Sequence, residues 1–380
     1  MRIIRIADVV NNRTGGMSRT MYCTGDHLIQ DGHDVDYLFQ ENFKTTSRGT
    51  LRTLLVSLEV LKIIKQRLKA GFCYDVVEIH EPIAAAYCWA KQFDRSLPPV
   101  VLFSYGIERR SQIVELDYYR QKNLPISLAL RSIRMTVLLS NYALRHCDRI
   151  VCSNSEDIQF LIDKGISSTK LALHQSGIDQ DFLDVSSSQI DDHLYKTSAQ
   201  DVRILFLGSW IVRKGILDIV EAMKKVLHDF PSVKLTVAGC SSSRDVVLSS
   251  FSESLHDQIQ VIPKIDGNDE LMKVYLAHSI LLLPSFFEGQ PLVLMEASAM
   301  GLVTVTTPIC GMKDFIESNK NGLTVSVGSP DEIIESISKL IINPEFRVSL
   351  GTMAKQKVAG YTWKNAAKKL ENSYRLVTDL

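Results

Sequence analysis

Short runs of apolar and β-branched residues alternate with helix-length segments along most of the 380-residue chain. Continuous apolar runs that alternate with helices are typical of parallel strands covered on both faces. The pattern therefore predicts an α/β fold with two doubly wound, Rossmann-like parallel sheets. The first set of predicted strands lies at 3–7, 35–39, 76–80, 100–103, 150–153 and 171–174. The second set lies at 203–208, 234–238, 260–263, 280–284, 303–306 and 323–325.

A polar stretch with few apolar residues separates the two sets, and we interpret residues 181–200 as a linker. An N-terminal domain at 1–180 and a C-terminal domain at 201–361 would each have the usual size of one domain. Open α/β sheets bind ligands outside the carboxyl ends of their strands. We therefore expect the two domains to face each other across a ligand-binding cleft.

The composition is that of a globular chain, with 45% hydrophobic and 23% charged residues and a mean hydropathy near zero. No segment has the ~20 apolar residues of a membrane span, and Arg2, Arg5 and Asp8 interrupt any signal-peptide core. Seven scattered cysteines without a C-x-x-C pair indicate neither a disulfide framework nor a zinc site. We expect a cytoplasmic protein.

A basic, leucine-rich segment at 44–69 has two interpretations. An amphipathic helix would bury helix-spaced leucines against the sheet, whereas an interfacial helix would present leucines and basic side chains to a membrane surface. The leucines are Leu51, Leu54, Leu55, Leu58 and Leu61. The basic residues, opposed only by Glu59, are Lys44, Arg48, Arg52, Lys62, Lys65, Arg67 and Lys69.

A glycine pair, Gly15 and Gly16, follows the first predicted strand. Paired glycines allow a tight turn and bring backbone amides to a helix N-terminus, which suits an anion. The loop lacks a full G-x-G-x-x-G pattern, so a plain tight turn explains it equally well.

Two adjacent cations, Arg213 and Lys214, follow the first strand of the second set, in the segment 208–215. An expected helix at 216–230 comes directly after them. Adjacent cations at this position can bind a pyrophosphate and stabilise the charge that develops as it leaves. Taken alone, the motif also fits a solvated basic turn.

The strongest motif, at 284–297, follows the fourth strand of the second set and contains Glu288 in a loop and Glu296 in the next helix. The first helical turn suits Pro291, and the positive end of the helix would point toward a phosphate. The two carboxylates can accept hydrogen bonds from sugar and ribose hydroxyls. The residues expected at this donor site are Ser209, Gly289, Gln290, Pro291, Leu292, Val293 and Glu296.

Together these motifs resemble the large family of retaining glycosyltransferases with the GT-B fold, usually numbered family 4. The resemblance spans nearly the whole chain and includes the segments 74–82, 153–156, 176–179 and 321–323. The last helix also looks like the family's segment that crosses back onto the first domain, so residues 362–380 are expected there.

The resemblance implies transfer of a sugar from a nucleotide-diphosphate donor with retention at the anomeric carbon. It implies that Lys214, helped by Arg213, binds the diphosphate, that Glu288 binds the donor sugar and that Glu296 binds the ribose. The glycine pair would line the cleft from the other side.

Two positions depart from the family pattern. Ser209 stands where many members have an arginine, so Arg213 would supply that charge. Tyr105, in the loop that also holds Glu108, stands where many members have a histidine. His80, at the end of the third predicted strand, either faces the cleft or is a structural histidine with satisfied hydrogen bonds.

The implied chemistry is expected to need no metal and no cofactor, since the nucleotide-diphosphate sugar is a substrate. In same-face attack the leaving phosphate takes the acceptor's proton, with Lys214 and Arg213 stabilising it; a covalent glycosyl-enzyme is the alternative route. The D-x-D motif at 34–36 starts the second strand and would be a poor divalent site without further oxygen ligands.

Two rival functions remain: a nucleotide-sugar epimerase of the same architecture, and a non-catalytic partner that binds sugar nucleotides. The presence of both Glu288 and Lys214 favours the transferase. The expected acceptor is a saccharide or a lipid-linked molecule in cell-surface polysaccharide or glycolipid synthesis, with peripheral membrane contact through the basic first domain. That domain also carries Arg131, Arg134, Arg145 and Arg149. No nucleic-acid partner is expected.

Overall fold

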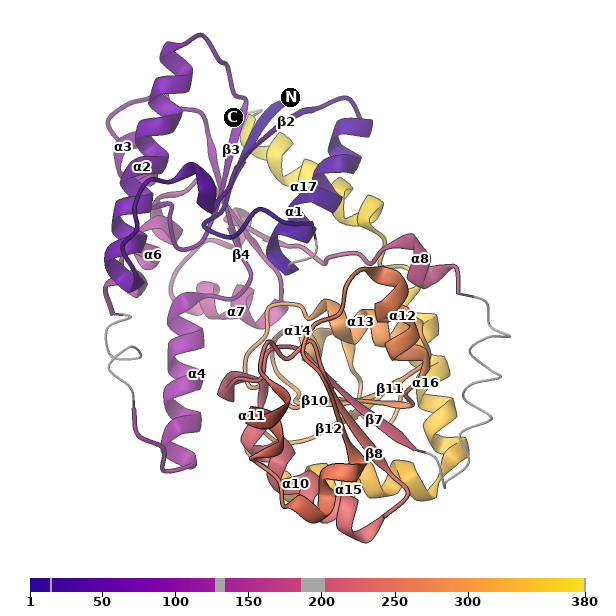
Figure 1. Ribbon diagram of the computed structural model, residues 1–380. Helices are drawn as coiled ribbons and strands as arrows, with labels where there is room; N and C mark the ends of the chain where they lie inside the picture. The colour runs from indigo at the N-terminus through magenta and orange to yellow at the C-terminus, as the bar shows by residue number, and fades with distance from the viewer. Residues whose placement is uncertain (14–15, 127–133, 186–201, 379–380) are drawn as a thin grey trace. The chain divides into compact units, whose positions relative to one another are not determined.

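The computed structural model describes residues 1–13, 16–126, 134–185 and 202–378 (Figure 1). The chain divides into two compact units, Met1–Gly177 with Trp363–Leu380, and Ile178–Thr362. Each unit contains one six-stranded parallel sheet with flanking helices. The predicted fold class, α/β with two doubly wound Rossmann-like sheets, is therefore confirmed.

The first sheet has the strand order β2-β1-β3-β4-β5-β6. Its strands are β1 (Arg2–Ile6), β2 (Asp34–Leu38), β3 (Val76–His80), β4 (Val100–Ser104), β5 (Arg149–Cys152) and β6 (Leu171–Leu173). Strand β3 is buried along its whole length: Val77 and Ile79 belong to the core on one face, and Val76 belongs to the core on the other. Burial on both faces explains why its apolar run is nearly continuous.

Helices cover both faces of this sheet (Figure 1). The core on one face is shared with α2 (Gly49–Lys69), α3 (Ala85–Lys91) and α6 (Arg134–His146). The core on the other face is shared with α1 (Gly16–Gln30) and α17 (Trp363–Thr378). The remaining elements are η1 (Gln40–Asn42), α4 (Glu108–Gln121), α7 (Ser155–Asp163) and η2 (Ser168–Lys170).

Helix α2 packs on the sheet through a stripe that contains Val56, Val60 and Ile64. Of the two interpretations of this segment, burial of the leucines holds for Leu61, which packs against this core, and not for Leu51, Leu54 and Leu58, whose exposed fractions are 56%, 38% and 50%. Both stripes have helical spacing, so either could have been the buried one. The β-branched stripe faces the core, and Leu51, Leu54 and Leu58 face outward.

A buried polar cluster ties helix α17 to the first sheet. The guanidinium of Arg5 donates from Nε to Glu78 Oε1 at 2.8 Å, and the hydroxyl of Tyr374 donates to the other Glu78 oxygen. All three side chains are fully buried. The Arg5 cation and the hydrogen bonds to Glu78 hold the pKa of this carboxyl well below its ordinary value, although burial opposes that shift. The C-terminal helix therefore docks through a paired buried charge as well as through apolar contact.

His174, just after β6, makes the stability of the first unit depend on pH. Burial lowers its pKa from 6.5 to about 3, and neither ring nitrogen has a hydrogen-bond partner among the described residues. Below pH 6.5 this histidine is protonated in the unfolded chain but stays neutral in the folded state. The free energy of unfolding therefore falls as the pH falls. We expect His174 to cost about 2 kcal/mol of unfolding free energy between pH 8 and pH 5.

Urea unfolding of the wild type and of His174→Leu at these two pH values measures this contribution. The variant should lose less stability on acidification than the wild type. Equal losses in the two proteins would show that His174 is not the titrating group.

The second sheet has the strand order β12-β11-β10-β7-β8-β9. Its strands are β7 (Arg203–Leu207), β8 (Lys234–Ala238), β9 (Ile259–Ile262), β10 (Ile280–Leu283), β11 (Val303–Thr306) and β12 (Leu323–Thr324). Alternate residues of β7 face two different cores, with Ile204 and Phe206 in one and Leu205 and Leu207 in the other. The sheet is thus covered on both faces.

The helices of the second unit are α8 (Gln180–Leu183), η3 (Val212–Lys214), α10 (Ile216–Asp229), α11 (Arg244–Leu248), η4 (Glu253–Gln258), α12 (Asn268–Leu276), α13 (Leu292–Ala299), α14 (Cys310–Phe315), α15 (Pro330–Ile342) and α16 (Pro344–Val358). Helix α8 occupies the start of the predicted linker 181–200, and Phe182 is buried in this unit's core. The rest of that linker from residue 186 lies outside the described residues. Of the helices described, none is long and apolar enough to cross a membrane.

Candidate functional site

The order of the second sheet reverses between β7 and β10, which lie side by side although two strands separate them in the chain. In open α/β sheets, ligands bind outside the carboxyl ends of the strands at such a reversal. The loop after β7 carries Arg213 and Lys214, and the loop after β10 carries Glu288. The topology therefore brings together two motifs that are about 75 residues apart in the sequence.

Arg213, Lys214 and Glu288 form one ion-pair cluster. Lys214 Nζ lies 2.6 Å from Glu288 Oε1, and Arg213 Nη1 lies 3.2 Å from the same oxygen. Arg213 Nη1 also donates to the carbonyl of Phe287 at 2.5 Å. The Lys214 and Glu288 side chains are only 13% and 12% exposed, and that of Arg213 is 34% exposed. The three predicted catalytic residues thus lie together, with two cations on one carboxylate.

Glycine at position 215 permits this approach of the two loops. Its φ of 74° is in the left-handed region that favours glycine. A Cβ atom at this position would lie 2.3 Å from the carbonyl oxygen of Pro284. Any larger residue would push the cation loop away from the loop that carries Glu288.

Gly311, in α14, holds the Glu288 loop from the other side. A Cβ atom there would lie 2.1 Å from the carbonyl oxygen of Gly289, and the Gly311 amide donates to the carbonyl of Glu288 at 3.4 Å. We expect Gly311→Ala to lower the unfolding free energy by about 1–3 kcal/mol, as overpacking does, and to weaken nucleotide binding.

Gly360→Ala is the matched control for Gly311→Ala, because a Cβ atom at position 360 meets no atom within 4 Å. Thermal unfolding with and without nucleotide diphosphate compares the two variants. Equal stability and equal ligand-induced stabilisation would show that the contact with Gly289 does not matter.

Helix α13 begins at Leu292, one residue after the predicted position, and Pro291 is its N-cap. The amides at the start of a helix have no intrahelical acceptors and form its positive end. Those of Leu292 and Val293 therefore suit an anion. Gln290, in the loop before the helix, donates from Nε2 to the sulfur of Met295 at 3.3 Å.

Glu296 lies in α13 with its side chain buried. Its Oε2 accepts a hydrogen bond from the hydroxyl of Tyr275, in α12, at 2.8 Å. Tyr275 was not predicted as part of the site, and its separation of 21 residues from Glu296 left no local sequence signal. Ser209, by contrast, is exposed in the loop after β7.

The other predicted site residues belong to the first unit. Gly16 is the exposed first residue of α1, and Gly15 lies outside the described residues. His80 is buried, with Nε2 2.7 Å from Glu78 Oε1, and its ring stacks on Tyr105 with 5.6 Å between centroids. Burial lowers the pKa of His80, which favours a neutral structural histidine.

Glu108, the first residue of α4, lies beside Glu81, a residue that was not predicted to belong to the site. Its backbone amide donates to Glu81 Oε1 at 3.3 Å. Burial and, secondly, the Glu108 charge raise the pKa of Glu81 to about 8, so this carboxyl holds a proton at neutral pH. The Ser140 hydroxyl also donates to Glu81. The signal that could have found Glu81 is its position directly after a buried strand.

No group of three or more histidine, cysteine, aspartate or glutamate side chains with metal-binding geometry occurs in the described ranges of the chain. In the D-x-D motif, Asp36 accepts a hydrogen bond from the Tyr74 hydroxyl at 2.6 Å and lies 3.5 Å from Arg67. The Asp36 carboxylate is therefore already paired with a hydroxyl and a guanidinium group.

Two family models match the chain. Residues 194–357 match the model described as Glycosyl transferases group 1, and residues 14–182 match the model described as Glycosyltransferase Family 4. An uncharacterized glycosyltransferase of Methanocaldococcus jannaschii is 30% identical over 183 residues, which are 47% of this chain and 45% of the relative. A D-inositol 3-phosphate glycosyltransferase of Corynebacterium jeikeium is 24% identical over 246 residues, 60% and 57% of the two chains. The chain thus spans about half the length of these curated relatives.

Solved structures share the whole fold. A sucrose-phosphate synthase from Thermosynechococcus elongatus has a TM-score of 0.75 at 18% identity, covering 100% of this chain and 99% of the other. The Anabaena protein Alr3699/HepE, solved in complex with UDP, has a TM-score of 0.70 at 14% identity, covering 99% and 100%. At these identities the likeness shows the fold alone.

Proposed function

Because the chain belongs to the group 1, family 4 glycosyltransferases with the GT-B fold, we propose that it transfers a sugar from a nucleotide-diphosphate donor to an acceptor hydroxyl, with retention at the anomeric carbon. The observation that carries this proposal is the cluster of Lys214, Arg213 and Glu288 at the order reversal of the second sheet. Two cations and the start of α13 suit a diphosphate, and the adjacent carboxylate suits sugar hydroxyls.

The ion pairs of the cluster favour a simple order of events. Glu288 is the shared anionic partner of Lys214 and Arg213 and balances one of their two positive charges. A diphosphate that binds beside the cations replaces Glu288 as their anionic partner. The carboxylate oxygen can then accept a hydrogen bond from the donor sugar. As the glycosidic bond to phosphate breaks, the same two cations stabilise the negative charge on the leaving group.

Retention by same-face attack then needs no protein nucleophile and no metal. The departing phosphate oxygen takes the proton of the acceptor hydroxyl, and the acceptor oxygen bonds to the anomeric carbon on the face that the phosphate leaves. Glu296, about one turn into α13, is the proposed ribose ligand. The hydrogen bond from Tyr275 holds the Glu296 carboxylate in a fixed orientation.

The proposed acceptor is a saccharide or lipid-linked molecule in cell-surface polysaccharide or glycolipid synthesis, at the cytoplasmic face of a membrane. The names of the curated relatives support this choice, since the corynebacterial relative is a D-inositol 3-phosphate glycosyltransferase. The exposed Leu51, Leu54 and Leu58 of α2 also support peripheral membrane contact.

Incubation with UDP-, GDP- and ADP-sugars and a panel of saccharide and lipid acceptors tests the proposed reaction. Nucleotide diphosphate should appear in step with a glycoside whose anomeric proton has the donor's configuration by NMR. An isomerised nucleotide sugar without a glycoside would favour the epimerase, and an inverted glycoside would reject retention.

A further inference from the structure

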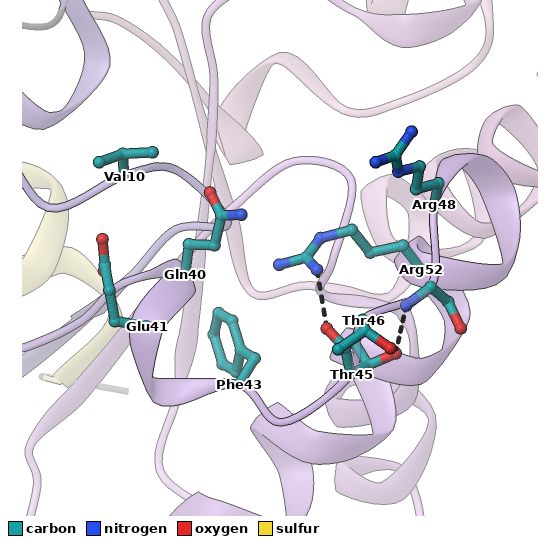
Figure 2. A pocket seen from close by; sticks show the side chains of 9 residues that line it. Val10, Gln40, Glu41, Phe43, Thr45, Thr46, Arg48 and Arg52 are labelled. Carbon is teal, nitrogen blue, oxygen red and sulfur yellow. Dashed lines mark hydrogen bonds between the residues drawn. The ribbon is translucent and has the colours of Figure 1, made fainter.

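A pocket of about 500 Å³ opens in the first unit, beside the carboxyl ends of β1 and β2 (Figure 2). Val10 follows β1 in the chain, Gln40 and Glu41 follow β2, and all three line the pocket. The order of this sheet reverses at β1, which pairs with β2 on one side and with β3 on the other. Ligands of open α/β sheets bind outside the carboxyl ends of the strands near such a reversal. The pocket therefore lies in a favourable place for a ligand, and its lining belongs entirely to the first unit.

Arg52, in α2, is fixed in this pocket by three hydrogen bonds. Its Nε and Nη2 donate to the two carboxylate oxygens of Asp8 at 2.8 and 2.6 Å, and its Nη1 donates to the carbonyl of Thr45 at 2.9 Å. A guanidinium group has five N–H donors. The two that remain make no hydrogen bond within the part of the chain that the structure describes. Since the paired bonds to Asp8 hold the plane of the group, these two donors are oriented before a ligand arrives.

Gln40 provides the complementary groups. Figure 2 shows its side chain and that of Arg52 pointing toward one another. The half-buried Gln40 side chain makes no hydrogen bond to the described residues, so its carbonyl oxygen and both N–H groups are available. The hydroxyls of Thr46 and Ser47 also line the pocket. The lining therefore offers both donors and acceptors, as adjacent hydroxyls of one sugar ring require.

The charges of the pocket balance each other. The Asp8 carboxylate neutralises Arg52, with 2.6 Å between the charged groups. The other two charged residues of the lining are Glu41 and Arg48, one of each sign, and Figure 2 places them at opposite ends. Glu41 is held in place because its Oε1 accepts a hydrogen bond from the backbone amide of Asn11 at 2.9 Å. A pocket without net charge suits a neutral ligand better than a phosphate.

We propose that this pocket binds a neutral sugar residue of the acceptor, with Arg52 and Gln40 hydrogen-bonded to its hydroxyls. Its volume is within the roughly 300–1,000 Å³ of small-molecule sites. The inference rests on the proposed function and deepens it, because it identifies the acceptor as a molecule that carries a neutral saccharide.

Binding to an array of immobilised neutral and acidic glycans, with and without nucleotide diphosphate, tests the proposal. The wild type should bind at least one neutral glycan. Gln40→Ala should weaken that binding about threefold to tenfold, the effect of losing one uncharged hydrogen bond. Arg52→Lys keeps the charge but loses the planar arrangement of donors, so it should weaken binding by about tenfold or more.

The matched controls are Gln356→Ala and Arg120→Lys. Gln356 is an exposed glutamine of the second unit, and Arg120 is an exposed arginine whose Nη1 lies 3.0 Å from Asp117. Both variants should bind glycans like the wild type. Binding of no neutral glycan, or binding that Gln40→Ala and Arg52→Lys leave unchanged, would overturn the proposal. Affinity for nucleotide diphosphates is measured on the same samples, so a failure of the sugar pocket is distinguishable from a failure of the donor site.

Discussion

Glu288→Ala is expected to lower turnover at least ~10²-fold, the usual effect of removing one group that stabilises a transition state. The reason is the position of this carboxylate, whose Oε1 lies 2.6 Å from Lys214 Nζ and 3.2 Å from Arg213 Nη1. In the proposed mechanism it accepts hydrogen bonds from sugar hydroxyls, beside the two cations proposed to bind the diphosphate. Because the variant keeps both cations, its affinity for a nucleotide diphosphate should not fall.

Glu317→Ala is the matched control for this substitution. Glu317 also lies between two cations, with 2.8 Å to Lys320 and 3.0 Å to Lys357, but its side chain is 52% exposed at the surface of the second unit. Steady-state release of nucleotide diphosphate compares the two variants. Turnover of Glu288→Ala close to that of the control would remove Glu288 from the catalytic site.

Lys214→Ala is expected to weaken binding of the nucleotide diphosphate roughly tenfold to hundredfold. A hydrogen bond to a charged group contributes about 1.5–3 kcal/mol, and the Lys214 side chain is less exposed than that of Arg213. Turnover should fall too, because the same cation is proposed to stabilise the leaving diphosphate. Calorimetric titration with the preferred nucleotide measures the affinity.

Lys214→Arg and Lys224→Ala are the controls for Lys214→Ala. The arginine variant keeps the charge and should recover part of the affinity, whereas loss of the exposed Lys224 should change nothing. Unchanged affinity in Lys214→Ala would count against a role for this lysine in binding the diphosphate.

Strand positions could be predicted from the sequence, because a strand that is buried on both faces has a continuous run of apolar residues. All twelve predicted apolar runs overlap strands of the structure, and no predicted end differs from the observed end by more than one residue. Strand order left no such mark. That β7 pairs with β10 depends on contacts between residues about 76 positions apart, such as Ile204 with Ile280. The reversal that defines the site was therefore visible only in the structure.

The site itself was predicted as separate motifs. A family resemblance predicted that Arg213, Lys214 and Glu288 act together. The structure adds that both cations contact the same oxygen, Glu288 Oε1. Tyr275, as the partner of Glu296, comes from another helix and could not be predicted. The leucines of α2 were ambiguous for a different reason: two apolar stripes with the same spacing lie on one helix, and only tertiary packing decides which is buried.

Thermal unfolding with UDP, GDP, ADP and their sugar conjugates, each with and without chelator, tests the proposed donor site at Lys214, Arg213 and Glu288. A ligand that binds only the folded state raises its stability. We expect one nucleotide diphosphate to stabilise the wild type, chelator to leave this stabilisation unchanged, and Lys214→Ala to lose most of it. Stabilisation by none of these ligands, or an equal effect in Lys214→Ala, would contradict the proposed donor site.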